Sequence, residues 1–135
     1  LRKALGVEEI AGTYKHRDLL VLLNKAADVQ NAKPDFTAIK KWQEKVIITA
    51  PGAGDIDFVS RFFAPSAGVD EDPVTGSAHS QLIPFWSEKL GKKNMQAKQL
   101  SKRGGELWLE DCGDRVTIAG QCVFYMKAEV ELNWQ

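Results

Sequence analysis

The residue types best suited to chemistry lie together in segment 68–79, which reads Gly-Val-Asp-Glu-Asp-Pro-Val-Thr-Gly-Ser-Ala-His. Its acids directly precede a turn into a predicted helix, and Thr75, Gly76 and Ser77 suit the helix entry, with Ser77 as the N-cap. The first N–H groups of a helix lack intrahelical partners and lie at the positive end of its dipole, so they can bind a carboxylate or phosphate. Asp72, a few residues earlier, could accept a hydrogen bond from an amine or hydroxyl of the same ligand. The segment therefore predicts a site for a small amino or hydroxy acid.

Other motifs do not fit this segment. A calcium loop would need an oxygen ligand at Val74 and glycine at Thr75, and a phosphate-binding P-loop would need lysine after Gly76. The two glycines in 52–54 lack the third glycine of a dinucleotide fingerprint and precede a strand. The residues alone leave a second interpretation open, in which 68–79 is an acid-rich loop that ends in an ordinary helix cap.

Two further residues are candidates for contact with a ligand. His79 lies in the first turn of the predicted helix, where it could line a cleft, although packing or hydrogen bonding in the core is the simpler expectation. Arg61 lies between aromatic neighbours on a predicted strand. Its guanidinium could steer an anionic substrate, but pairing with Asp70 or Asp72 is the simpler expectation.

Length and composition are those of one globular domain, predicted over residues 1–135. Of these residues 44% are hydrophobic and 27% charged, with 18 basic and 18 acidic side chains. The longest apolar runs, such as 19–23, are far shorter than the roughly 20 residues of a membrane span. Cys112 and Cys122 are too few for a disulfide scaffold and lack metal or redox spacing. We therefore expect a cytoplasmic protein with free thiols, no metal site and no membrane contact.

One segment carries a local excess of positive charge. Residues 91–105 contain five basic residues and no acidic one, a pattern that can face nucleic-acid phosphates. The segment has no aromatic residue to stack on bases, and the whole chain is neutral. We expect a solvated surface and no nucleic-acid partner.

The pattern of apolar residues predicts an α+β fold. The one strong helix is predicted over 77–90, buried on several sides and kinked at Pro84 without ending there. A short helix should begin at Pro34, and 65–76 should be a loop. Strands are predicted over 10–14, 18–23, 46–49, 57–64, 95–101, 107–110, 115–119 and 122–132. Together these elements predict a curved, mostly antiparallel sheet wrapped around one central helix, without a parallel βαβ layout.

Several blocks of the sequence closely resemble the phenazine-biosynthesis-like (PhzF-type) isomerase family of the diaminopimelate epimerase-like superfamily. The blocks are Asp57–Pro65, Glu71–His79, Pro84–Trp86, Leu90–Gly91 and Ser101–Leu107. The similarity spans almost the whole chain but only the C-terminal half of the usual family protein. That protein is built from two similar domains with the active site in the cleft between them.

The resemblance implies roles for the residues of the motif. Asp72 matches the aspartate that is thought to hold the substrate and assist proton movement, so it is the expected catalytic residue. Thr75 matches the motif threonine, and Gly76 and Ser77 match the Gly-Ser that helps bind the substrate carboxylate. Family members work without metal or organic cofactor, and a glutamate of the first domain is the general acid/base.

The resemblance thus predicts the C-terminal domain of a cofactor-independent isomerase or epimerase-like enzyme that acts on a small carboxylate-bearing metabolite. The best-known family member isomerises a dihydro-hydroxyanthranilate. Because the first domain and its glutamate are missing, this chain alone is expected to be inactive until that domain is supplied. The alternative is a non-catalytic module that binds small anions or serves as a dimerisation domain, and a homodimer is a further expected assembly.

Overall fold

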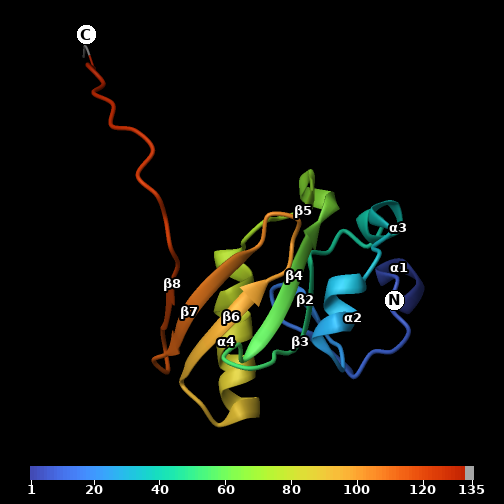
Figure 1. Ribbon diagram of the computed structural model, residues 1–135. Helices are drawn as coiled ribbons and strands as arrows, with labels where there is room; N and C mark the ends of the chain where they lie inside the picture. Colours follow the sequence, from blue (N-terminus) through green and yellow to red (C-terminus); the bar gives the residue numbers. More distant parts are fainter. Residues whose placement is uncertain (133–135) are drawn as a thin grey trace.

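Eight strands form one curved, open sheet in the computed structural model, which describes residues 1–132 (Figure 1). The strands are β1 (Gly12–Lys15), β2 (Leu19–Leu22), β3 (Val46–Pro51), β4 (Phe58–Ala64), β5 (Val69–Glu71), β6 (Asn94–Gln99), β7 (Gly105–Asp111) and β8 (Val116–Ala119). The helices are α1 (Arg2–Leu5), α2 (Ala26–Asn31), α3 (Phe36–Lys40), the 3-10 helix η1 (Pro65–Ala67) and α4 (Gly76–Leu90). The sheet order is β1-β2-β3-β4-β6-β7-β8, and β5 pairs with β4. Most pairs are antiparallel, so the predicted α+β class is confirmed.

Two strand pairs are parallel, and the expectation of a sheet without βαβ units was wrong. Strand β2 pairs with β3 across the connection that holds α2 and α3, and β4 pairs with β6 across the connection that holds α4. A parallel pair needs such a long crossover because the chain must return to the same end of the sheet. The predicted loop over 65–76 also contains structure, since η1 and β5 lie within it.

Apolar side chains on the two faces of the sheet pack into two separate cores. On β3, Ile47 packs with residues of α4, whereas its neighbour Ile48 packs with residues of α1, α2 and α3. On β4, Phe62 and Phe63 alternate in the same way. Figure 1 shows α4 on one side of the sheet and α2 on the other. Burial on both faces explains why the central strands read as continuous apolar runs.

Helix α4 buries one face, and the expectation that it is buried on several sides was wrong. The buried residues are Ala78, His79, Leu82, Ile83 and Trp86. The indole N–H of Trp86 donates to the Thr49 hydroxyl at 3.0 Å, which ties the helix to β3. Pro84 lies on the exposed side, where the Ser80 carbonyl that loses its helical partner can be hydrated. The helix therefore continues through the proline, as predicted, while the sheet covers only its inner face.

Residues 120–132 form an extended tail without helix or strand, so the long strand predicted over 122–132 was wrong. The tail leads away from β8 and from the sheet (Figure 1). It has six hydrophobic side chains that are 66–92% exposed: Val123, Phe124, Tyr125, Met126, Val130 and Leu132. A strand needs a neighbour that accepts and donates its backbone hydrogen bonds, and no other part of residues 1–132 lies beside the tail in the sheet.

None of the helices within residues 1–132 has both the length and the apolar character needed to cross a membrane.

Candidate functional site

Asp72 is fixed at its backbone and at one carboxylate oxygen. Its N–H donates to the Phe62 carbonyl of β4 at 3.1 Å, and its own carbonyl accepts from the Gln99 side chain at 2.7 Å. The Thr75 hydroxyl donates to Oδ2 of the half-buried Asp72 carboxylate. Oδ1 has no hydrogen-bond partner within residues 1–132. The carboxylate is thus held in place with one oxygen left for a ligand.

Helix α4 begins one residue earlier than predicted, and the expectation that Ser77 is its N-cap was wrong. Thr75 is the N-cap, in extended conformation, and its carbonyl accepts from the His79 N–H at 3.3 Å. The Thr75 side chain does not cap the helix because it is engaged with Asp72. Ser77 is instead an exposed residue of the first turn.

The first amides of α4 are only partly satisfied by the protein. The Thr75 N–H donates to Oε1 of Gln99 at 2.8 Å. The N–H groups of Gly76, Ser77 and Ala78 have no acceptor within residues 1–132. A Cβ built on Gly76 would meet no atom within 4 Å, so there is open space beside the first turn. The free N–H donors predicted at the helix entry are therefore present, on the first three residues of α4.

The segment that joins β6 to β7 holds the motif from the other side. The Ser101 hydroxyl donates to the Pro73 carbonyl at 2.7 Å and accepts from the Gly104 N–H at 3.0 Å. Gly105 packs so closely that a Cβ there would lie 2.4 Å from a Val74 methyl carbon. A side chain at this position would displace Val74, so Gly105 allows the segment to pack against the motif.

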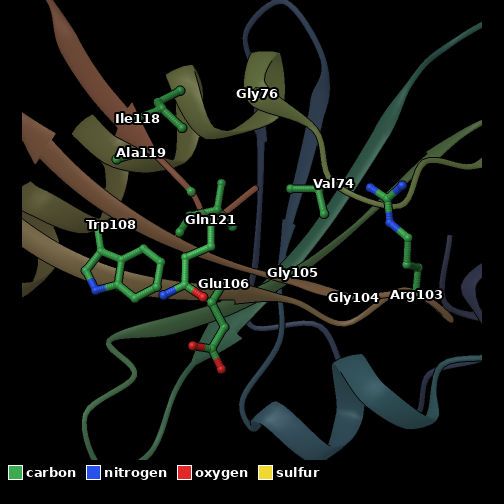
Figure 2. A pocket seen from close by; sticks show the side chains of 12 residues that line it. Val74, Gly76, Arg103, Gly104, Gly105, Glu106, Trp108, Ile118, Ala119 and Gln121 are labelled. Atoms are coloured by element: carbon green, nitrogen blue, oxygen red, sulfur yellow. The ribbon is translucent and has the colours of Figure 1, made fainter. Parts of the chain in front are cut away.

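A hollow of about 690 Å³ opens beside the helix entry (Figure 2). Figure 2 shows Val74 and Arg103 on one side and Trp108, Ile118 and Gln121 on the other. Gly76 is the only predicted site residue that lines it, and Asp72, Thr75 and Ser77 do not. The hollow is formed in part by the start of the exposed tail.

His79 is a core residue and does not reach the surface. Its ring is fully buried, lies roughly parallel to the Phe58 ring, and Nδ1 donates to the Thr75 carbonyl at 2.8 Å. Nε2 is buried without a hydrogen-bond partner within residues 1–132. Burial lowers the pKa of His79, and the hydrogen bond to Thr75 only partly offsets this. The simpler of the two expectations for His79 is therefore the one that the structure shows.

Arg61 forms a salt bridge, but with neither of the predicted partners. Its Nε and Nη2 donate to the Glu71 carboxylate at 2.7 and 3.0 Å, and its Nη1 donates to the carbonyls of Val29 and Ala32 at 3.2 and 2.8 Å. Residues on one strand alternate between faces, which places Arg61 on the α2 side, away from α4. The expectation of Asp70 or Asp72 as the partner was wrong, because Glu71 pairs with Phe63 of β4 and therefore lies on the same face of the sheet as Arg61.

The remaining sequence expectations concern metal ligands, the basic segment and the cysteines. No group of His, Cys, Asp or Glu within residues 1–132 has the geometry of a metal site. In the basic segment 91–105, Lys92 pairs with Asp57 and Lys98 with Glu106. Both cysteines are free and exposed.

Gln99 and Ser101 are the residues of this site that sequence reasoning missed. They lie 27 and 28 residues from the motif residues whose carbonyls they contact, and only the parallel pairing of β6 with β4 brings these contacts about. A buried glutamine at the end of an alternating strand is a weak signal in sequence. The block 101–107 carries a signal in sequence only through the family resemblance.

The sequence pattern of the family described as phenazine biosynthesis-like protein (PhzC-PhzF) matches residues 6–128. The chain belongs to this family. Among its relatives are two proteins of Pseudomonas aeruginosa, each named as an uncharacterized isomerase. One is 47% identical over 135 residues, covering 98% of this chain and 51% of the relative. The other is 39% identical over 132 residues, again covering 51% of the relative.

Solved structures agree with this membership of the phenazine biosynthesis-like family. A PhzF-family protein of Enterococcus faecalis aligns with a TM-score of 0.84 and 43% identity, over 88% of this chain and 46% of its own. A protein of Clostridium difficile described as a putative phenazine biosynthesis PhzC/PhzF protein aligns with a TM-score of 0.80 and 46% identity, over 90% and 48%. The chain thus spans about half the length of these relatives.

Proposed function

We propose that this chain forms one wall of the active site of a cofactor-independent isomerase or epimerase that moves a proton on a small carboxylate-bearing metabolite. One observation carries the proposal. Asp72 has a single fixed carboxylate oxygen and a free one, and it lies just ahead of a helix entry with unpaired amides. This arrangement offers a hydrogen-bond acceptor and a set of anion-binding donors to one small molecule. The isomerase names of the relatives support it.

The proposed chemistry needs only proton transfer. In an isomerisation or epimerisation of this kind one C–H bond breaks and another forms, with no net oxidation and no transferred group. The substrate carboxylate would lie at the amides of Gly76 and Ser77, where the open space beside Gly76 gives it room. The free Oδ1 of Asp72 would accept a hydrogen bond from an amine or hydroxyl of the substrate and assist the proton's movement.

We propose that the site is completed by the part of the family protein that this chain does not cover. A general acid/base must come within about 2.6–3.2 Å of the moving proton. Glu71 does not supply this group, because its carboxylate is held by Arg61 on the other face of the sheet. We therefore propose that a glutamate of the half that this chain does not cover acts opposite Asp72, and that this chain alone is inactive.

A second candidate function is a non-catalytic module that binds small anions or assembles with another copy. The exposed hydrophobic tail favours this candidate, because such surfaces usually meet a partner. It predicts saturable binding of small carboxylates without proton exchange, even when the remaining half is present.

The test measures solvent deuterium incorporation by mass spectrometry. The chain would be assayed alone and joined to the uncovered half of the 47% identical Pseudomonas relative, with that half alone as control. The probes are a dihydro-hydroxyanthranilate and a panel of amino and hydroxy acids in D₂O. We expect incorporation only by the joined protein. The proposal fails if the joined protein incorporates no deuterium into any probe, or if the control half does so equally well.

A further inference from the structure

We propose that Gln99 is a positioning residue for Asp72. Its buried side chain holds Thr75 and the backbone of Asp72 in place, so that the Thr75 hydroxyl reaches one carboxylate oxygen of Asp72 and the other oxygen stays open to the substrate. This inference rests on the proposed function of the site. Gln99 is the last residue of β6 and is only 1% exposed.

The side-chain amide of Gln99 has a single possible orientation. Its partners are the Thr75 N–H, which can only donate, and the Asp72 carbonyl, which can only accept. Oε1 must therefore face Thr75 and Nε2 must face Asp72. Nε2 carries two hydrogens, and the second reaches the Thr75 hydroxyl oxygen at 3.1 Å. Both hydrogens and the oxygen of this amide are thus in use.

Gln99 also helps to place the Thr75 hydroxyl for the next hydrogen bond, whose direction is fixed because a carboxylate only accepts. A hydroxyl has one hydrogen to donate, and the Thr75 oxygen already accepts from Gln99. The Thr75 hydrogen is therefore free to point to Oδ2 of Asp72, which it reaches. The same amide holds the Asp72 carbonyl, so Gln99 fixes both the backbone and the carboxylate of that residue.

A purely structural role for Gln99 predicts different behaviour from a positioning role. If Gln99 only seals the end of β6, its replacement lowers stability, and the remaining folded enzyme works normally. If it positions Asp72, the folded variant loses turnover at unchanged substrate affinity. The introduced group should also change the pH profile when it is itself titratable.

Two substitutions separate these roles. Gln99→Leu keeps the approximate size and removes all three hydrogen bonds. Gln99→Glu keeps an acceptor for the Thr75 N–H but, when ionised, turns a second acceptor toward the Asp72 carbonyl and the Thr75 hydroxyl. The matched controls are Gln96→Leu and Gln96→Glu, three residues earlier on β6, where the glutamine side chain makes no hydrogen bond within residues 1–132.

The first measurement is turnover of the joined protein between pH 5 and 8, on whichever probe acid the wild type deuterates. We expect kcat to fall at least tenfold in Gln99→Leu, with KM within about threefold of wild type. In Gln99→Glu the rate relative to wild type should rise as the pH falls, because the protonated carboxyl regains a donor. Both Gln96 variants should follow the wild-type profile. Full kcat in a folded Gln99→Leu variant would overturn the proposal, as would a relative rate of Gln99→Glu that does not change with pH.

The second measurement is independent of activity. Amide hydrogen exchange of Thr75, followed by NMR in the 135-residue chain, should be at least tenfold faster in Gln99→Leu and unchanged in Gln96→Leu. Unchanged exchange in Gln99→Leu would overturn the contact itself. If no probe is deuterated by the joined wild type, the proposed function fails and the catalytic part of this role with it. Fast Thr75 exchange would still show that Gln99 holds the motif.

Discussion

At the scale of single residues, the site is a set of fixed polar groups with a few left unpaired. The backbone of Asp72 is tied to β4 and β6, while Oδ1 and the first amides of α4 have no partner within residues 1–132. Polar groups in proteins usually have hydrogen-bond partners when they are buried. The unpaired groups here lie beside residues that are held in place, and they are available to a ligand. His79 is buried behind the site and holds Thr75 by a hydrogen bond to its carbonyl.

His79 should make the fold sensitive to acid. Burial lowers the pKa of His79 in the folded state below the ordinary value of 6.5. Above that pH both states are neutral; as the pH falls below it, the unfolded chain binds the proton first, so stability is lost. We expect the free energy of unfolding to fall by up to about 1.4 kcal/mol per pH unit from this group. Urea unfolding at several pH values measures it.

Two variants provide the controls for this pH dependence. His79→Phe keeps a ring against Phe58 and should remove the His79 component of the slope below pH 6.5. His16→Gln, at an exposed position, should retain the His79 component of the slope. An identical slope in wild type and His79→Phe would contradict the prediction.

At the scale of elements, local signals in sequence were sufficient where an element depends on its own residues. The β-branched run at 46–49 predicted the start of β3, which ends two residues later than expected, and Gly91 predicted the end of α4. Asp72 and Thr75 were also within reach, because their contact spans three residues of one turn. These are cases in which sequence neighbours are also spatial neighbours.

The missed features all depend on distant parts of the chain. The parallel pair β2–β3 needs the crossover through α2, a six-residue helix without a clear apolar period. Gln99 contacts the motif across 24 residues. Arg61 pairs with Glu71 because of strand register, which a single sequence does not specify. The tail 120–132 has the composition of a strand but no neighbour, and composition does not reveal a missing partner.

A substitution of Gly76, at the start of α4, should affect turnover without lowering stability. A Cβ there meets no atom within 4 Å and the residue is not at positive φ, so the chain itself does not require glycine. Gly76→Ala should leave stability unchanged or raise it by about 0.4–1 kcal/mol. It should lower turnover of the joined protein at least tenfold, because the methyl group occupies the proposed carboxylate position. Thermal unfolding and deuterium incorporation measure the two effects, and full activity in Gly76→Ala would contradict the proposed position.

Arg61 should matter for stability rather than for substrate binding. Its side chain is 11% exposed and pairs with the Glu71 side chain, which is 19% exposed. Arg61→Met leaves that carboxylate unpaired and should lower the free energy of unfolding by about 2–4 kcal/mol. Lys92→Met breaks a more exposed pair and should cost less than about 1 kcal/mol. A raised KM in the joined Arg61→Met protein at unchanged stability would instead identify Arg61 as a substrate contact.

At the scale of the whole molecule, the chain resembles one half of its relatives and exposes an apolar tail. It spans about half the length of the two Pseudomonas proteins, and the tail begins at the rim of the hollow beside α4. An exposed apolar segment of this size favours association. The proposed active site and the tail therefore belong to the same region of the molecule.

The chain alone should self-associate through its tail. We expect concentration-dependent dimers or larger species in analytical ultracentrifugation, and a shift toward monomer in the double variant Phe124→Ser, Tyr125→Ser. Both side chains are more than 80% exposed, so their replacement should not disturb the sheet. Val69→Ser, at an exposed apolar position on β5, is the matched control. Monomer at all concentrations in the unaltered chain would contradict this expectation.

The role of Asp72 in proton transfer is tested most directly by solvent deuterium incorporation in the joined protein carrying Asp72→Asn. The substitution keeps the size of the side chain and an acceptor for Thr75 but removes the carboxylate. Asp70→Asn, two residues earlier and exposed, is the control. We predict that Asp72→Asn lowers the rate about 10²- to 10⁴-fold, while Asp70→Asn stays within about twofold of wild type. Equal rates in Asp72→Asn and wild type would contradict the proposed catalytic role.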